Sequence, residues 1–196
     1  MPKTFLFIDG ENFLHKVEEV LEARKISEAK IDLARINLKE LFGKRLSDYK
    51  LSKMFFYGAR LHENKETLKK SKELVNFQRR LRTNLEKQGF TFIMAGNVRG
   101  QTVTINGHKK VIFREKGVDV KIAVDLVSLA CGKEIDTAIL CSSDSDLQPA
   151  VTELKKRKVK IVYLGFEIKP NKGLIYTTDK TVLLKNSDIV DVCPRV

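Results

Sequence analysis

The sequence has 196 residues, of which 42% are hydrophobic, and it carries 37 Lys and Arg against 25 Asp and Glu, a formal net charge of +12. This length suits one α/β domain with a full core, so we expect a single domain over residues 1–196. The excess of positive charge favours a polyanionic partner, nucleic acid before an anionic membrane, although a generally lysine-rich proteome would give the same balance.

Cysteine content and hydropathy argue against several other classes. The three cysteines, Cys131, Cys141 and Cys193, lack Cys-x-x-Cys spacing, so neither a disulfide framework nor a zinc site is predicted. The first apolar run, 5–8, is too short for the core of a signal peptide, and no run approaches the length of a membrane span. We therefore expect a cytoplasmic protein with no membrane association.

The chain opens with a predicted buried strand at 4–8, followed by Asp9-Gly10-Glu11-Asn12 and a helix over about 13–24. Asp9 thus follows the carboxyl end of a strand, and Asn12 falls on the first turn of the helix. An aspartate at such a junction is often only a helix cap, and for Asp9 alone that interpretation is favoured.

Helices are predicted over 32–42, after a cap at Asp32, and over about 65–88, with a strand at 53–57 between them. The long second helix has one apolar stripe and one strongly basic face. A solvated surface is the default interpretation of such a face. In a basic protein its arginines are also candidates for contact with RNA phosphates, namely Arg79, Arg80 and Arg82.

A third strand is predicted at 90–94, and residues about 98–114 read as a β-hairpin because Asn106-Gly107 is a strong signal for a tight turn. We expect this hairpin to be an arm inserted beside the main sheet. It leads into Lys116, and its cations are further candidates for RNA binding: Arg99, Lys109, Lys110, Arg114 and Lys116.

The rest of the chain alternates helices and strands. An apolar helix begins at Asp119, a buried strand at 138–141 ends in Ser142-Ser143-Asp144-Ser145-Asp146, and a helix from Leu147 precedes a strand at 159–164. In the less regular segment 166–196 we expect a short helix near 181–184 and an edge strand at 188–192. This order predicts an α/β fold with a mostly parallel central sheet covered on both faces.

Four carboxylates are therefore expected at one edge of the sheet: Asp9, Asp119, Asp144 and Asp146. Each has a plain alternative, since Asp144 would cap a helix and Asp119 would interact with a helix dipole. Together, with no Cys or His nearby, they form an all-oxygen set that suits Mg²⁺ or Mn²⁺. Metal ions about 4 Å apart at such sites assist phosphoryl transfer, while surrounding Lys and Arg hold the phosphate backbone.

Three motifs in this order resemble the NYN domain, in the LabA-like branch of the PIN-like nuclease superfamily: Asp9-Gly10-Glu11-Asn12, 116–126 and 142–146. The resemblance covers about residues 4–165 and implies a PIN-like three-layer α/β/α sandwich. It further implies a metal-dependent ribonuclease in which Asp9, Asp119, Asp144 and Asp146 bind the metal and Asn12 supports them. Ser143 and Leu147 depart from the family pattern, where Gly and Phe are usual.

The leading hypothesis is a Mg²⁺- or Mn²⁺-dependent endoribonuclease, and the alternative is a non-catalytic RNA-binding or regulatory module on the same fold. RNA is favoured over DNA, although the acids themselves do not distinguish the two. A homodimer is compatible with the sequence and would extend the basic surface. A nucleotide-binding protein or phosphatase is disfavoured because no glycine-rich phosphate loop is present.

Overall fold

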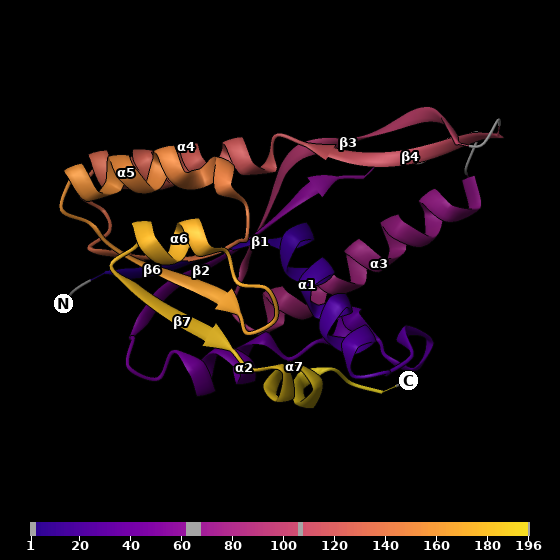
Figure 1. The fold of residues 1–196 in the computed structure, drawn as a ribbon, viewed down its shortest axis with the longest axis horizontal. Helices are drawn as coiled ribbons and strands as arrows, with labels where there is room; N and C mark the ends of the chain where they lie inside the picture. The colour runs from indigo at the N-terminus through magenta and orange to yellow at the C-terminus, as the bar shows by residue number, and fades with distance from the viewer. Residues whose placement is uncertain (1–2, 62–67, 106–107, 196) are drawn as a thin grey trace.

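One seven-stranded sheet lies at the centre of the protein (Figure 1). The computed structural model describes residues 3–61, 68–105 and 108–195, and for residues 28 and 99–115 it describes the backbone alone. The strand order is β4-β3-β2-β1-β5-β6-β7, and all neighbours are parallel except β3 and β4. The predicted α/β class with a mostly parallel sheet is confirmed. The strands are β1 (Thr4–Asp9), β2 (Leu51–Arg60), β3 (Thr91–Ile105), β4 (His108–Lys116), β5 (Thr137–Cys141), β6 (Lys160–Phe166) and β7 (Lys180–Leu184).

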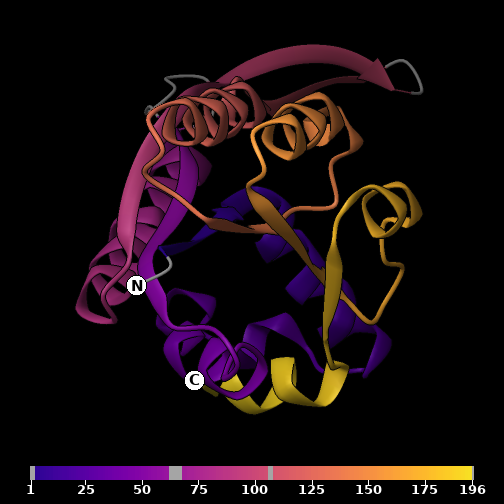
Figure 2. The same ribbon diagram turned by 90° about the vertical axis from the view of Figure 1, so that its left-hand side faces the viewer.

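Helices cover both faces of this sheet and make the predicted three layers (Figures 1 and 2). One face carries α1 (Gly10–Ala23), α2 (Leu38–Arg45), α3 (Leu68–Lys87) and α7 (Asn186–Val192). The other carries α4 (Val118–Cys131), α5 (Gln148–Lys156) and α6 (Lys172–Thr177). Within the described ranges, no helix combines the length and apolarity that crossing a membrane requires.

The central strand β1 is buried on both faces, as its continuous apolar run predicts. Leu6 and Ile8 pack into the core under α1, α2 and α7, whereas Phe5 and Phe7 pack under α4 and α5. Strand order reverses beside β1, because the chain first adds β2 and β3 on one side and later adds β5 and β6 on the other. Open α/β sheets bind ligands at such a switch point, beyond the carboxyl ends of the strands.

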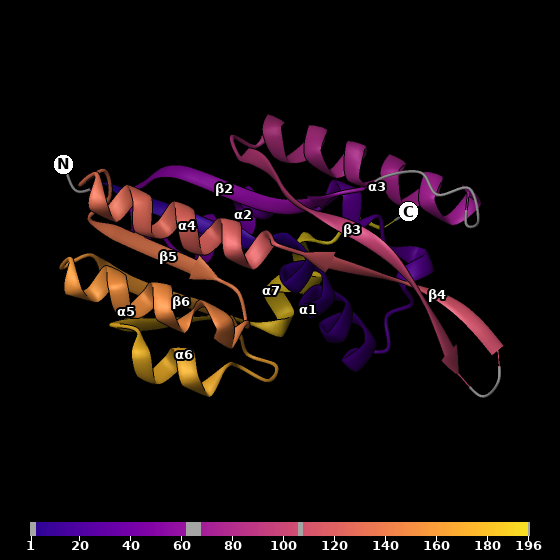
Figure 3. The same ribbon diagram turned by 90° about the horizontal axis from the view of Figure 1, so that it is seen from above.

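The predicted hairpin is a direct extension of the sheet rather than a separate insertion. Strand β3 is continuous over 15 residues, so the short strand predicted at 90–94 and the first half of the arm are one element. It pairs with β4 from Asn97 opposite Lys116 to Ile105 opposite His108, and the predicted turn at 106–107 lies outside the described residues. This arm and α3 extend beyond the edge at which the parallel strands end (Figure 3).

Three predicted elements are wrong. The expected edge strand at 188–192 is part of helix α7, where Ile189 and Val192 lie on one face and are buried against other helices. The expected helix at 181–184 belongs to β7, which extends the sheet beside β6. The expected helix at 32–42 is divided into a 3₁₀ turn, η2 (Leu33–Arg35), and α2, because Asn37 caps α2 and Asp32 makes no capping hydrogen bond.

Candidate metal centre and substrate groove

Asp9 lies at the carboxyl end of β1 and is only 7% exposed. Its Oδ1 accepts a hydrogen bond from the Asn12 backbone N–H at 3.2 Å, so it is the N-cap of α1, and its Oδ2 accepts one from the Ser142 hydroxyl at 3.1 Å. Burial raises the pKa of this carboxyl from 3.8 to about 6, against the lowering effect of both hydrogen bonds. Nearby carboxylates, first Asp144 and then Glu11, raise it further.

This raised pKa predicts that Asp9 destabilises the metal-free fold at neutral pH. The penalty develops as pH rises from about 4, near the ordinary pKa, to about 6, and is complete above that. In EDTA, the free energy of unfolding of Asp9→Asn relative to the parent is therefore expected to rise by about 1–3 kcal/mol between pH 4 and pH 8, on top of a pH-independent cost because the Asn amide nitrogen cannot accept the Ser142 hydroxyl hydrogen. Urea unfolding at a series of pH values measures this. Equal destabilisation at both pH values would contradict the prediction.

The segment after β5 places Asp144 beside Asp9, with Asp146 two residues farther along. Asp144 Oδ1 accepts the Asp146 backbone N–H at 2.9 Å and so caps η4 (Ser145–Leu147), as the simpler interpretation expects. The Asp144 N–H donates to the Ser142 hydroxyl at 3.1 Å, and the Ser143 N–H donates to Asn12 Oδ1 at 2.9 Å. Asn12 therefore fixes this segment to the start of α1, and the capping role of Asp144 does not remove it from the site.

Asp119 is brought in by a close approach between two backbone segments. Helix α4 begins after Gly117, whose φ is +90°, and Gly96 of β3 faces this turn with a φ of +65°. A Cβ atom at Gly96 would lie 2.1 Å from the Lys116 carbonyl oxygen, so only glycine allows this contact. The contact sets the first turn of α4, and with it Asp119, at the carboxyl edge of the sheet.

Asp119, Asp144 and Asp146 form an acidic cluster in which one oxygen from each side chain lies within 4.8 Å of the others. Asp119 and Asp144 are half-buried, and Asp146 is exposed. Three carboxylates at this spacing repel one another unless a cation lies between them, and an oxygen-only set suits Mg²⁺ or Mn²⁺. Asp9, the fourth predicted ligand, is not in this cluster, since both its oxygens face hydrogen-bond donors of the fold.

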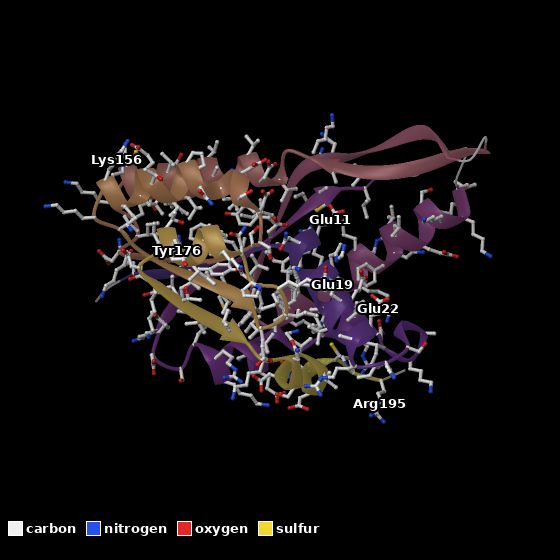
Figure 4. The ribbon with its side chains drawn as sticks, in the orientation of Figure 1. Glu11, Glu19, Glu22, Lys156, Tyr176 and Arg195 are labelled. Atoms are coloured by element: carbon white, nitrogen blue, oxygen red, sulfur yellow. The ribbon has the colours of Figure 1, made fainter. Side chains whose placement is uncertain are left out.

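An acidic groove of about 780 Å³ runs past the cluster and contains most of the predicted site. Glu11 lies near the base of the arm and Glu19 farther along α1 (Figure 4). Two cations, Lys16 and Lys116, also line it, and Lys16 pairs with Glu19 at 2.9 Å. Its lining residues are Asp9, Glu11, Asn12, His15, Lys16, Glu19, Lys116, Gly117, Asp119, Val120, Ser143 and Asp144.

The predicted RNA-binding cations are less concentrated at this groove than expected. Lys116 lines it, whereas Arg79, Arg80 and Arg82 are exposed on α3 and do not. Arg80 is paired with Asp32, and Arg82 with Glu86 at 2.8 Å. The side chains of the remaining candidates lie outside the part of the chain whose side chains are described: Arg99, Lys109, Lys110 and Arg114.

Two supporting residues had not been predicted from sequence. Asn171 caps α6 and donates through Nδ2 to the Ser143 carbonyl at 2.8 Å, and its own N–H donates to the Tyr163 hydroxyl at 3.0 Å. It therefore holds the carbonyl of Ser143, whose N–H is bound to Asn12, and no sequence signal joins residues so far apart. Lys16 has a signal, because it follows Asn12 by four residues and so shares a helical face with it.

A three-layer α/β domain with carboxylates at the switch point is compatible with the PIN-like nuclease superfamily, to which the NYN domain belongs. A family model, the NYN domain, matches residues 3–185, and the chain belongs to the NYN domain family. A crystal structure of a protein of unknown function from Vibrio parahaemolyticus has the same fold, with a TM-score of 0.55, 17% identity and coverage of 93% of both chains. No curated protein matches the sequence.

Proposed function

We propose that this protein is a metal-dependent endoribonuclease that hydrolyses RNA phosphodiester bonds with Mg²⁺ or Mn²⁺. The observation that carries the proposal is the acidic cluster at the switch point of an NYN domain. We further propose that Asp9 serves as a fourth carboxylate and that the protein is a cytoplasmic member of the LabA-like branch.

The residues of the groove suit this chemistry. A bound metal would neutralise charge on the scissile phosphate and lower the pKa of a water molecule. Asp119, Asp144 and Asp146 would hold the metal, and Asn12 keeps the backbone around Ser143 in place for them. Lys116 would supply positive charge to the phosphate backbone from the same groove, whereas the charge of Lys16 is balanced by Glu19.

The preference for RNA rests on the resemblance to the NYN family, because carboxylates and metal ions act on the phosphate that RNA and DNA share. The net charge of +12 supports a polyanion of either kind. A direct comparison of the two substrates is therefore part of the test.

We expect the protein to cut labelled single-stranded RNA at least about 100-fold faster with Mn²⁺ or Mg²⁺ than in EDTA, since metal assistance contributes several kcal/mol. A DNA strand of matched sequence, incubated in parallel, should be cut more slowly. Equal cutting of DNA would contradict the proposed substrate. Binding of RNA without cutting under every condition, weakening steeply with salt, would instead support the non-catalytic RNA-binding module.

A further inference from the structure

A second groove, distinct in chemistry, lies beside the acidic groove. This apolar groove has a volume of about 590 Å³ and is bounded by α1, by α3 and by the face of β2 and β3. Its volume falls within the range of about 300–1,000 Å³ that is usual for small-ligand sites. Most of its wall is apolar and aromatic, with Phe56, Leu74, Phe77, Leu81 and Phe92.

The first half of α1 is a ridge between the two grooves. With 3.6 residues per turn, Glu11 and His15 point between the face of Leu14 and the face of Asn12. Glu11 and His15 accordingly line both grooves, whereas Leu14 lines only the apolar groove and Asn12 only the acidic one. A strand of nucleic acid needs only to cross one helix, about 10 Å wide, to occupy both.

The floor of the apolar groove is aromatic but closely packed, since Phe56 is 2% exposed and Phe92 8% exposed. The rings of Phe56 and Phe92 pack with centroids 5.4 Å apart, tilted by 31°. Gly58 lies beside the Phe92 ring, and a Cβ atom there would come within 3.0 Å of that ring. Gln78 of α3 donates to the Ala59 carbonyl at 2.7 Å and fixes α3 against the strand, with Phe77, half-buried, on the groove wall.

We propose that the apolar groove binds an unpaired base of the same RNA strand whose phosphate lies in the acidic groove. This inference rests on the proposed function. A nucleobase has flat faces that stack on an aromatic ring such as that of half-buried Phe77, and polar edges that suit Glu11 and His15 on the ridge. The groove lining is mixed in charge, with Glu11 and Glu18 on α1 and Lys70 on α3. Lys70 and the exposed Lys69 and Lys72 of α3 are available to the phosphates that flank a bound base, which favours a nucleic-acid strand over an apolar peptide or lipid.

The test uses the absence of tryptophan from this sequence. Phe77→Trp, made together with Asp144→Asn so that RNA stays intact, places the only tryptophan of the variant in the groove wall, where it can be excited selectively. Binding of an eight-nucleotide RNA should quench its fluorescence, and a uniformly abasic chain with the same phosphates should not. Anisotropy of end-labelled strands should show the intact RNA binding about tenfold more tightly than the abasic one, the usual contribution of one stacked base.

Two further variants provide a substitute probe and a control. Leu74→Trp probes the groove wall about one turn earlier if Phe77→Trp does not fold, and Val75→Trp places the fluorophore on α3 outside the groove lining. Quenching at 77 or 74, but not at 75, supports the proposal. RNA that binds without quenching, or an abasic strand that quenches equally, overturns it. If RNA quenches the fluorescence although the parent protein never cuts RNA, the base-binding proposal stands and only the proposed nuclease activity is wrong.

Discussion

Replacing Asp144 by Asn is expected to lower RNA cleavage by about 100- to 1,000-fold while leaving stability almost unchanged. The carboxylate belongs to the acidic cluster, and losing one charged ligand removes several kcal/mol of metal-dependent transition-state stabilisation. The fold should tolerate the change because Asn retains the oxygen that accepts the Asp146 backbone N–H, and Asn is as good a helix cap as Asp. Initial cleavage rates in Mn²⁺ and thermal unfolding in EDTA measure the two effects.

Asp48→Asn is the matched control, because it removes the same charge from an exposed residue that lines neither groove. It should cut RNA at the parent rate. Equal activity of Asp144→Asn and the parent would show that the acidic cluster is not the catalytic centre. Equal loss in both variants would show that net charge, rather than the site, controls the rate.

Much of the site was predictable because strand ends are visible in sequence. Asp9 and the segment 142–146 each follow a short, fully apolar run, and such runs become strands buried on both faces. Parallel strands end at one edge, so residues that follow them are brought together without any knowledge of side-chain contacts. The structure brings Asp144 and Asp146 to this edge in this way, whereas Asp119 joins the cluster through the close approach of Gly96 to Lys116 and Gly117. Asp9 lies outside this cluster, and its role as a metal ligand stays a prediction.

The features that were not predicted from the sequence depend on contacts between residues far apart in the chain. Asn171 reaches Ser143 across 28 residues, and the apolar groove joins α1 to a helix more than 50 residues later in the chain. Neither contact has a local signature. The C-terminal errors have the same origin, since Asp188–Val192 is rich in β-branched residues like a strand but packs against α1 and α2 as a helix. Tertiary packing overrides local propensity in such short segments.

Gly10→Ala is expected to destabilise the protein by about 3 kcal/mol and to disturb the metal site at the same time. Helix α1 begins at Gly10, immediately after Asp9, and lies so close to β2 that a Cβ atom would meet both the Phe56 ring and the Tyr57 carbonyl oxygen at 2.4 Å. Backbone cannot yield as a flexible side chain can, so the start of α1 must move. That movement would displace Asp9 and Asn12, which hold the segment from Ser142 to Ser143.

Gly43→Ala separates this effect from the general consequence of replacing glycine in a helix. Gly43 lies in α2, and a Cβ atom there meets nothing within 4 Å. Alanine should therefore stabilise the protein by about 0.5–1 kcal/mol, because it restricts the unfolded chain and favours the helix. Urea unfolding of both variants in EDTA tests the opposite signs, and Mn²⁺ titration should show weaker binding only for Gly10→Ala. Stabilisation by both substitutions would mean that α1 does not lie against β2 as closely as the structure describes. The position of α1 as the ridge between the two grooves would then be wrong.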